Sequence, residues 1–192
     1  MRTFVLYARK AWTSPKFRLG DLIGAGRMDL VCRCISSALW LSHKAREDAR
    51  IYVVLNGPPN PPVTICFQGS EYSKVYVDEI TNAKWIKSML SLQFGKDWVE
   101  FEGTKIARKS FQEVLTELGG KNYVLHEKGE FIDNVKLDQK PIIILGDQIG
   151  LPRAEEGFAL RNGGEKISLG KNVYLASSCI SILNWVCDKQ GI

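Results

Sequence analysis

Two short glycine-bearing segments near the C-terminus have the residue types and spacing of a small-molecule binding site. Gly146–Gly150 (GDQIG) follows the apolar run Pro141–Leu145, and Leu169–Leu175 (LGKNVYL) follows the run Lys166–Leu169. Ligands of α/β proteins bind outside the carboxyl ends of strands, where glycine lets backbone groups approach a flat ligand closely. Two such loops lying together would form a cofactor cleft, although the same spacing also fits two ordinary turns.

Other common catalytic signatures are missing from the sequence. Gly24–Gly26 does not complete a dinucleotide fingerprint, because Asp29 stands where G-x-G-x-x-G needs its third glycine. There is no phosphate-binding G-x-x-x-x-G-K-[ST] and no G-x-S-x-G nucleophile elbow. Five cysteines and two histidines give no zinc-ligand spacing, since Cys32–Cys34 is not a C-x-x-C pair. We therefore expect free thiols and no metal site.

The positive charge of the chain is concentrated in its first quarter. The formal net charge is +5, and residues 1–50 hold ten Lys and Arg against four Asp and Glu. The rest of the chain carries a net charge of −1. Clustered Lys and Arg bind phosphate groups, so the asymmetry indicates a polyanionic partner such as RNA. A solvated basic face without a partner would show the same asymmetry.

Composition places the chain among folded globular proteins. Hydrophobic residues make up 45% and charged residues 24% of the 192 residues, which excludes disordered and low-complexity classes. No apolar run approaches the roughly 18–20 residues that span a bilayer, and the start, MRTFVLYARKAW, lacks a secretory cleavage site. We expect a cytoplasmic protein with no membrane segment, folded as one domain over residues 1–192.

Short apolar runs alternate with helical periodicity along the chain, which predicts an α/β fold with a largely parallel sheet. The Ala8–Gly26 segment contains Pro15 and three glycines and predicts a long loop. Ser110 and Glu113 predict a capping box at the start of a helix. The predicted strands cover 3–7, 51–55, 63–67, one or two segments within 98–107 around Gly103, 123–125, 141–145 and 166–169. The predicted helices cover 27–42, 78–92, 111–118 and 176–189, with Ile80 facing inward and Lys128–Gly129 forming a turn.

Two blocks of the sequence resemble a known family. PIIILGDQIGLPRAEEGF and EKISLGKNVYLASSCISILNWVCD resemble the C-terminal region of the SPOUT RNA methyltransferases. The block from GRMDLVCRC to GPPNPPVTICFQGSE is similar to the archaeal-type tRNA pseudouridine-54 N1-methyltransferases, relatives of the ribosomal-RNA pseudouridine N1-methyltransferases. The resemblance covers nearly the whole chain and is weakest at residues 93–104.

This resemblance implies a fold, a cofactor and an activity. The fold would be a SPOUT-type α/β domain with a trefoil knot over about 122–192, assembled as a homodimer. The activity would be S-adenosyl-L-methionine-dependent methylation of N1 of pseudouridine 54 in the TΨC loop of tRNA. Two alternatives stay open: a SPOUT enzyme acting on ribosomal RNA pseudouridine or a ribose 2′-hydroxyl, and a non-enzymatic RNA-binding protein.

The resemblance also assigns residues by position. The implied cofactor pocket comprises Leu125, Gly146, Ile167, Ser168, Leu169, Gly170, Val173, Leu175 and Cys179. For Cys179 the alternative is a small buried core residue.

On the acceptor side, Arg27 would stabilise charge on the uracil carbonyls, and Asp29 would take the N1 proton or accept a hydrogen bond from N1–H. A structural role for Asp29, balancing a helix dipole, is the alternative. Trp12 and Phe17 would stack on bases or anchor a loop, and Gly57–Pro62 (GPPNPP) would stiffen a cleft wall or form a tight turn. The candidates for phosphate contacts are Arg9, Lys10, Lys16, Arg18 and Arg33.

Overall fold

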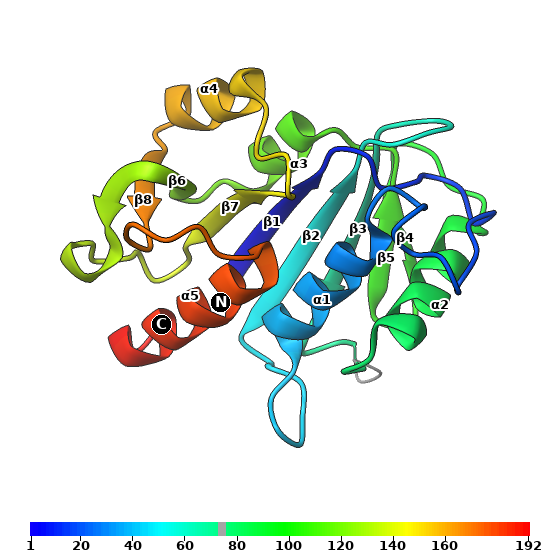
Figure 1. Ribbon diagram of the computed structural model, residues 1–192, viewed down its shortest axis with the longest axis horizontal. Coiled ribbons are helices and arrows are strands. Elements are labelled where there is room, and N and C mark those ends of the chain that lie inside the picture. The colour runs from blue at the N-terminus through cyan, green and yellow to red at the C-terminus, as the bar shows by residue number, and fades with distance from the viewer. Residues whose placement is uncertain (73–75) are drawn as a thin grey trace.

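The computed structural model describes residues 1–72 and 76–192, and shows one sheet with helices on both faces (Figure 1). Eight strands of the described residues form this sheet in the order β4-β5-β3-β2-β1-β7-β6-β8. The strands β2, β1, β7, β6 and β8 are parallel to one another. The strands β3, β5 and β4 extend the sheet beyond β2 with antiparallel pairings. The predicted α/β fold with a largely parallel sheet is therefore confirmed, with an antiparallel edge that the alternation did not predict. The strands are β1 (Arg2–Ala8), β2 (Ala49–Leu55), β3 (Val63–Gln68), β4 (Val99–Phe101), β5 (Thr104–Ala107), β6 (Asn122–Phe131), β7 (Ile142–Gly146) and β8 (Glu165–Ser168).

The central strands read as continuous apolar runs because both of their faces are buried. Successive side chains of a strand point to opposite faces, so β1 places Phe4 and Leu6 in one core and Val5 in another. The larger core lies under α1 (Met28–Leu39), α2 (Glu79–Leu90) and α5 (Ala176–Gln190). The smaller core lies under α3 (Phe111–Leu118) and α4 (Arg153–Arg161).

Local signals predicted some helix boundaries well and missed others. The capping box of α3 is present, since the Ser110 side chain accepts from the Glu113 backbone and the Glu113 side chain accepts from the Ser110 backbone. The first predicted helix is shorter than expected, because α1 begins after Arg27 and ends at Leu39. The inward placement of Ile80 is wrong: it lies in the first turn of α2 and is 41% exposed. No helix was predicted over α4, because only Ala159 of its nine residues is fully buried and its apolar stripe is weak.

The predicted turn at Lys128–Gly129 is wrong, because β6 continues through it to Phe131. Its pairing with β8 shifts register between Leu125 and Glu130, so the strand bulges there. A β-carbon at Gly129 would lie 2.4 Å from the carbonyl carbon of Ile167, so only glycine permits this close approach.

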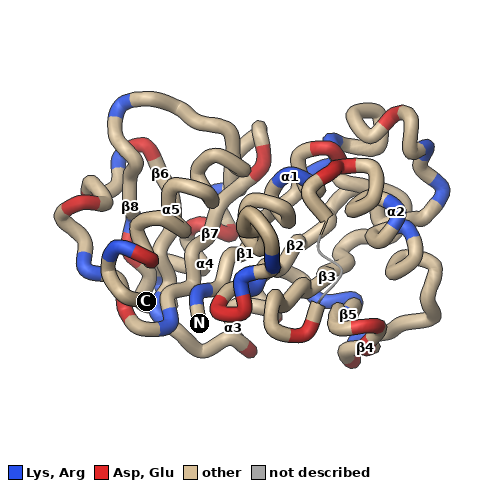
Figure 2. The backbone as a smooth tube through the Cα atoms, turned by 90° about the horizontal axis from the view of Figure 1, so that it is seen from below, with Lys and Arg blue, Asp and Glu red and all other residues tan. Residues whose placement is uncertain are grey.

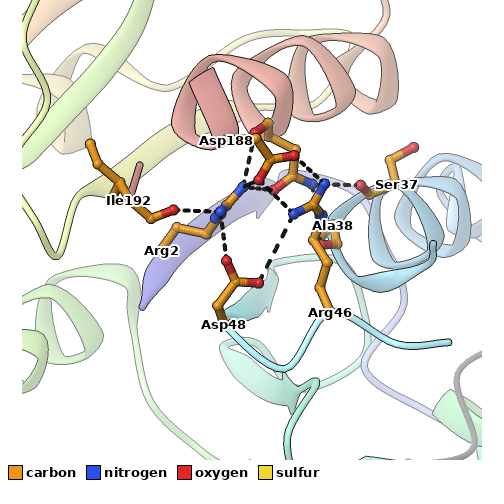
Figure 3. A network of polar contacts seen from close by, with 8 residues as sticks. Arg2, Ser37, Ala38, Arg46, Asp48, Asp188 and Ile192 are labelled. Atoms are coloured by element: carbon orange, nitrogen blue, oxygen red, sulfur yellow. Dashed lines mark hydrogen bonds and ion pairs between the residues drawn. The ribbon is translucent and has the colours of Figure 1, made fainter. Parts of the chain in front are cut away.

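A buried arginine joins the first strand to the last helix (Figure 3). The Arg2 side chain is 2% exposed, and its Nη1 donates to the Asn184 carbonyl (2.8 Å) and pairs with Asp188 (2.8 Å). Its Nη2 donates to Asp48 (2.6 Å) and to the Ile192 carbonyl (2.5 Å). Arg46 adds a second pair of hydrogen bonds to Asp188. We call Arg2, Arg46, Asp48 and Asp188 the Arg2 cluster.

The predicted loop Ala8–Gly26 is confirmed except at Ala8, which ends β1, and residues 9–26 are held against the loop that follows β2. The Lys10 carbonyl lies so close to Gly26 and Gly57 that a β-carbon at either position would approach it to about 2 Å or less. Thr13 fastens the same two loops, donating to the Gly57 carbonyl and accepting from the Asn60 backbone. This packing positions the residues that precede α1.

Candidate functional site

The two glycine-bearing segments meet at one cavity of about 620 Å³. One wall is the middle of β6, at Leu125–Glu127, and another is Ile149–Leu151 from the loop after β7. The segment Ser168–Tyr174 after β8 and Cys179 of α5 complete it, together with Arg153 and Glu156 of α4. Residues from β6, the loop after β7, α4, the end of β8 with the segment after it, and α5 therefore converge on one cavity.

Six of the nine residues assigned to the cofactor by position line this cavity, namely Leu125, Ser168, Leu169, Gly170, Val173 and Cys179. Gly146 is not part of the lining but supports it, because a β-carbon there would lie 2.3 Å from the Gly150 carbonyl carbon. Ile167 is fully buried behind the wall, and Leu175 is 62% exposed outside the cavity.

Cys179 closes the cavity from the first turns of α5. It is 6% exposed, and burial raises the pKa of its thiol above the usual value. Because the thiolate is the nucleophilic form of cysteine, Cys179 is suited to be a wall rather than a nucleophile.

Several charged cavity residues were not singled out from the sequence. They are His126, Glu127, Arg153, Glu156 and Lys171. His126 and Glu127 directly follow the predicted strand 123–125, so their place at the end of that predicted strand was a signal that the sequence offered. Arg153 and Glu156 were missed because α4 was not predicted.

A second polar group surrounds Asp29 at the start of α1. Asp29 accepts from Arg27 Nε (3.0 Å) and Nη2 (3.0 Å), and from Arg33 Nη2 (2.8 Å). Arg33 Nη1 donates to Glu79 of α2 (2.8 Å). The Arg27 backbone has a left-handed conformation (φ 68°) that is uncommon outside glycine and turns the chain into the helix. We call Arg27, Asp29, Arg33 and Glu79 the Asp29 cluster.

Asp29 is buried and remains ionised. Burial alone would raise the pKa of this carboxyl group, but hydrogen bonds from Arg27 and Arg33 outweigh it and hold the pKa below its usual value of 3.8. A carboxylate with a lowered pKa is a weak proton acceptor at neutral pH. Its geometry fits the fixing of two guanidinium groups, each about a third exposed.

The cavity loop and the Asp29 cluster are linked through Asp147, which follows β7. Its carboxylate accepts from the Ile149 backbone (2.9 Å), within the cavity loop, and from the Arg9 backbone (2.7 Å), just after β1. The hydrogen bond to Asp29 is the largest cause that raises the pKa of Arg27, and the charge of Asp147 adds to it. The cavity and the Asp29 cluster therefore both lie on the side of the sheet where the parallel strands β1 and β7 have their carboxyl ends.

Lys and Arg lie along the loops beside α1 and α2 (Figure 2). Lys10, Lys16 and Arg18 are exposed, as phosphate contacts require, and Arg9 is half-buried. Arg33 differs, because its guanidinium already pairs with two carboxylates. The aromatic side chains anchor the loop: Phe17 is buried beneath Lys87, and Trp12 packs on the core.

Among residues 1–72 and 76–192, no group of His, Cys, Asp and Glu is arranged to hold a metal, and the five cysteines are unpaired. Within the same described residues, no helix is both long and apolar enough to cross a membrane.

Comparisons with known proteins show a similar fold in one solved structure and membership of one sequence family. The fold is similar to that of Archaeoglobus fulgidus Nep1 bound to S-adenosylhomocysteine, with a TM-score of 0.66, 14% identity and 98% of each chain covered. A sequence model of the family described as "Putative SAM-dependent RNA methyltransferase" matches residues 1–192, and the chain belongs to this family.

The chain is also similar over its full length to curated relatives. A protein of Methanocaldococcus jannaschii is 41% identical, with 100% of this chain and 98% of the relative covered. A protein of Methanocella arvoryzae is 38% identical, with 99% and 100% covered. Both are named tRNA (pseudouridine(54)-N(1))-methyltransferase.

Proposed function

We propose that this protein transfers a methyl group from S-adenosyl-L-methionine to N1 of pseudouridine 54 in the TΨC loop of tRNA. The observation that carries the proposal is the identity of 38–41% over the full length to relatives with that name. The cavity between the two glycine loops supports it independently, since it supplies a site for the methyl donor.

The cavity residues fit this cofactor. Its volume of about 620 Å³ lies within the roughly 300–1,000 Å³ typical of small-molecule sites. Leu125, Leu169 and Val173 offer apolar surface to an adenine, and the backbone of Ser168–Gly170 offers edge contacts. Cys179 would close the site, while Gly146 and Ile167 hold its walls from behind and Leu175 begins α5. The bound cofactor supplies an electrophilic methyl group on a positively charged sulfur.

We assign the acceptor chemistry to Arg27 and Asp29. Pseudouridine N1 must lose its proton to become a good nucleophile, and the negative charge then spreads onto the uracil carbonyls. Arg27 uses Nε and Nη2 to bind Asp29, which leaves Nη1 free to donate to such a carbonyl. Asp29 holds the guanidinium in place and accepts a hydrogen bond from N1–H, the direct role that its low pKa favours, and the N1 proton passes to solvent water as N1 accepts the methyl group.

We propose that Arg9, Lys10, Lys16 and Arg18 bind the RNA backbone, and that Arg33 acts mainly on Asp29. The target base lies within a folded loop, so it must leave its stack to reach the site. Arg27 follows this basic segment in the sequence. Like the cavity, it lies at the carboxyl-end side of the parallel strands.

We further propose one cytoplasmic domain over residues 1–192, a trefoil knot over about 122–192 and a homodimer. The exposed apolar side chains Val173, Leu175 and Trp185 support the dimer. They are 90%, 62% and 58% exposed beside the cavity and along α5, and a second copy would cover them.

A transfer assay tests the activity. Purified protein is incubated with methyl-labelled cofactor and two otherwise identical tRNA transcripts that carry uridine or pseudouridine at position 54. We expect label only in the pseudouridine transcript. Equal labelling of both transcripts, or of neither, contradicts the proposal, and resistance of the neighbouring phosphodiester to alkali would indicate ribose methylation instead.

Substitution of Asp29 separates the acceptor site from the cofactor site. Asp29→Asn removes the charge that fixes Arg27 and Arg33, so turnover should fall at least 100-fold. Calorimetry with S-adenosylhomocysteine should show an affinity within about twofold of the unchanged protein. Loss of cofactor binding would contradict the assignment of Asp29 to the acceptor side.

A further inference from the structure

The α4 helix places two opposite charges on the cavity wall. Arg153 and Glu156 are three positions apart, which puts them on the same face of a helix, and both line the cavity. The comparisons assign no role to either residue.

Glu156 has one engaged oxygen and one open oxygen. Its Oε1 accepts from Lys166 Nζ (2.7 Å), whereas its Oε2 lies 3.8 Å from His126 Nε2, too far for a direct hydrogen bond. The His126 ring accepts from the Lys128 backbone at Nδ1 (3.0 Å), so the neutral ring carries its hydrogen on Nε2, toward Glu156. Lys166 thus anchors the carboxylate while Oε2 keeps its capacity to accept.

Arg153 is exposed at the start of the same helix. Within the part of the chain that the structure describes, its guanidinium makes no hydrogen bond and no ion pair. An unpaired guanidinium three residues from a half-engaged carboxylate gives the cavity one free donor group and one free acceptor group.

We propose that Glu156 binds the ammonium group, and Arg153 the carboxylate, of the amino-acid end of S-adenosyl-L-methionine. The inference rests on the proposed function, because it concerns the same cavity. A ribose diol is uncharged and is satisfied by neutral donors and acceptors, whereas the methionyl end is a zwitterion that pairs with one negative and one positive side chain. Lys166 holds the Glu156 carboxylate at the cavity wall through its contact with Oε1.

Two ligands and three variants test the proposal by calorimetry. S-adenosylhomocysteine carries the amino-acid end, and 5′-methylthioadenosine keeps adenine, ribose and thioether but lacks that end. The variants are Glu156→Gln, Arg153→Gln and, as a matched control, Glu165→Gln, whose side chain pairs with Lys121 outside the cavity. We expect Glu156→Gln to weaken S-adenosylhomocysteine about 10-fold, Arg153→Gln about 5-fold, and the control not at all.

The affinity for 5′-methylthioadenosine distinguishes the outcomes. It should stay within about twofold in all three variants, which also shows that they are folded. Equal weakening of both ligands by Glu156→Gln would place Glu156 at the ribose and overturn the assignment, as would unchanged S-adenosylhomocysteine affinity in both cavity variants. If the unchanged protein binds neither ligand, the cofactor site itself is wrong, and the proposed function fails with it.

Discussion

The Arg2 cluster and the Asp29 cluster use the same chemical groups with opposite burial. In the Arg2 cluster the arginine side chain is 2% exposed, and its carboxylate partners Asp48 and Asp188 are 50% and 43% exposed. In the Asp29 cluster the carboxylate is 8% exposed, and Arg27 and Arg33 are 32% and 33% exposed. A buried guanidinium spends its donors inside the protein, whereas a buried carboxylate holds guanidinium groups whose remaining donors face outward.

We infer that this difference separates a structural role, for the Arg2 cluster, from the binding role proposed for the Asp29 cluster. Arg2 joins β1 to the Asn184 and Ile192 carbonyls of the C-terminal segment, so its Nη1 and Nη2 donors are used inside the protein. Arg27 keeps Nη1 free of any bond within the described residues. Ion pairs alone therefore do not mark a functional site; the direction of the unused donors does.

Replacing Arg27 should have the largest effect on activity. Arg27→Ala removes the outward donor, and removal of one such donor typically lowers turnover by about 10²–10³. Single-turnover methyl transfer to pseudouridine-containing tRNA measures this loss, and denaturant unfolding should show only a partial loss of stability, because Arg33 still pairs with the buried Asp29 carboxylate. Near-normal turnover in Arg27→Ala would remove Arg27 from the acceptor site.

Replacing Arg2 should instead lower the stability of the protein and leave cofactor binding unchanged. Arg2→Met leaves the Asn184 and Ile192 carbonyls without their donor, so the free energy of unfolding should fall by about 3 kcal/mol. The half-exposed carboxylates regain water, which limits the loss. At 25 °C the folded variant should bind S-adenosylhomocysteine within twofold of the unchanged protein. Unchanged stability, or a selective loss of cofactor affinity, would contradict the structural role.

Arg18 tests whether exposed cations of the first quarter contact RNA. Arg18→Ala should reduce the slope of log affinity against log salt concentration by about one unit, because one phosphate contact is lost. Filter binding of tRNA over a range of salt concentrations measures the slope. Arg161→Ala, an exposed arginine on α4, is the matched control and should leave the slope unchanged. An unchanged slope in Arg18→Ala would exclude Arg18 from the RNA contact.

Acid should weaken both clusters, and we expect this to be the smallest of the four predicted effects. Burial tends to raise the pKa of Asp29 and Asp188, but hydrogen bonds from arginines hold both pKa values below 3.8 in the folded protein. Their stabilisation is therefore complete above the unfolded value and is lost as pH falls through the lower folded values. Unfolding free energies measured from pH 7 down to about pH 3 should fall less in Asp188→Asn than in the unchanged protein. If both proteins lose unfolding free energy equally as the pH falls, Asp188 does not contribute to the acid sensitivity.

The sequence predicted element types far better than it predicted contacts. Apolar runs such as Ile51–Leu55 and the Ser110–Glu113 capping box act within a few residues, so local patterning is enough to recognise them. The same patterning missed α4 and stopped β6 too early, because the burial of these elements comes from distant partners. Gly129 reads as a turn residue locally, but the approach of Ile167 is what requires it.

For the candidate site, the sequence alone determined which segments hold the candidate residues: two glycine loops, the GRMD block and a basic first quarter. Only the tertiary structure decided how their side chains are used. It put Gly146 behind the cavity, turned Glu156 and Arg153 into it, and buried Asp29 while leaving Arg27 partly exposed. The physical reason is that burial and charge pairing depend on neighbours brought together from distant parts of the chain, which residue types and spacing do not record.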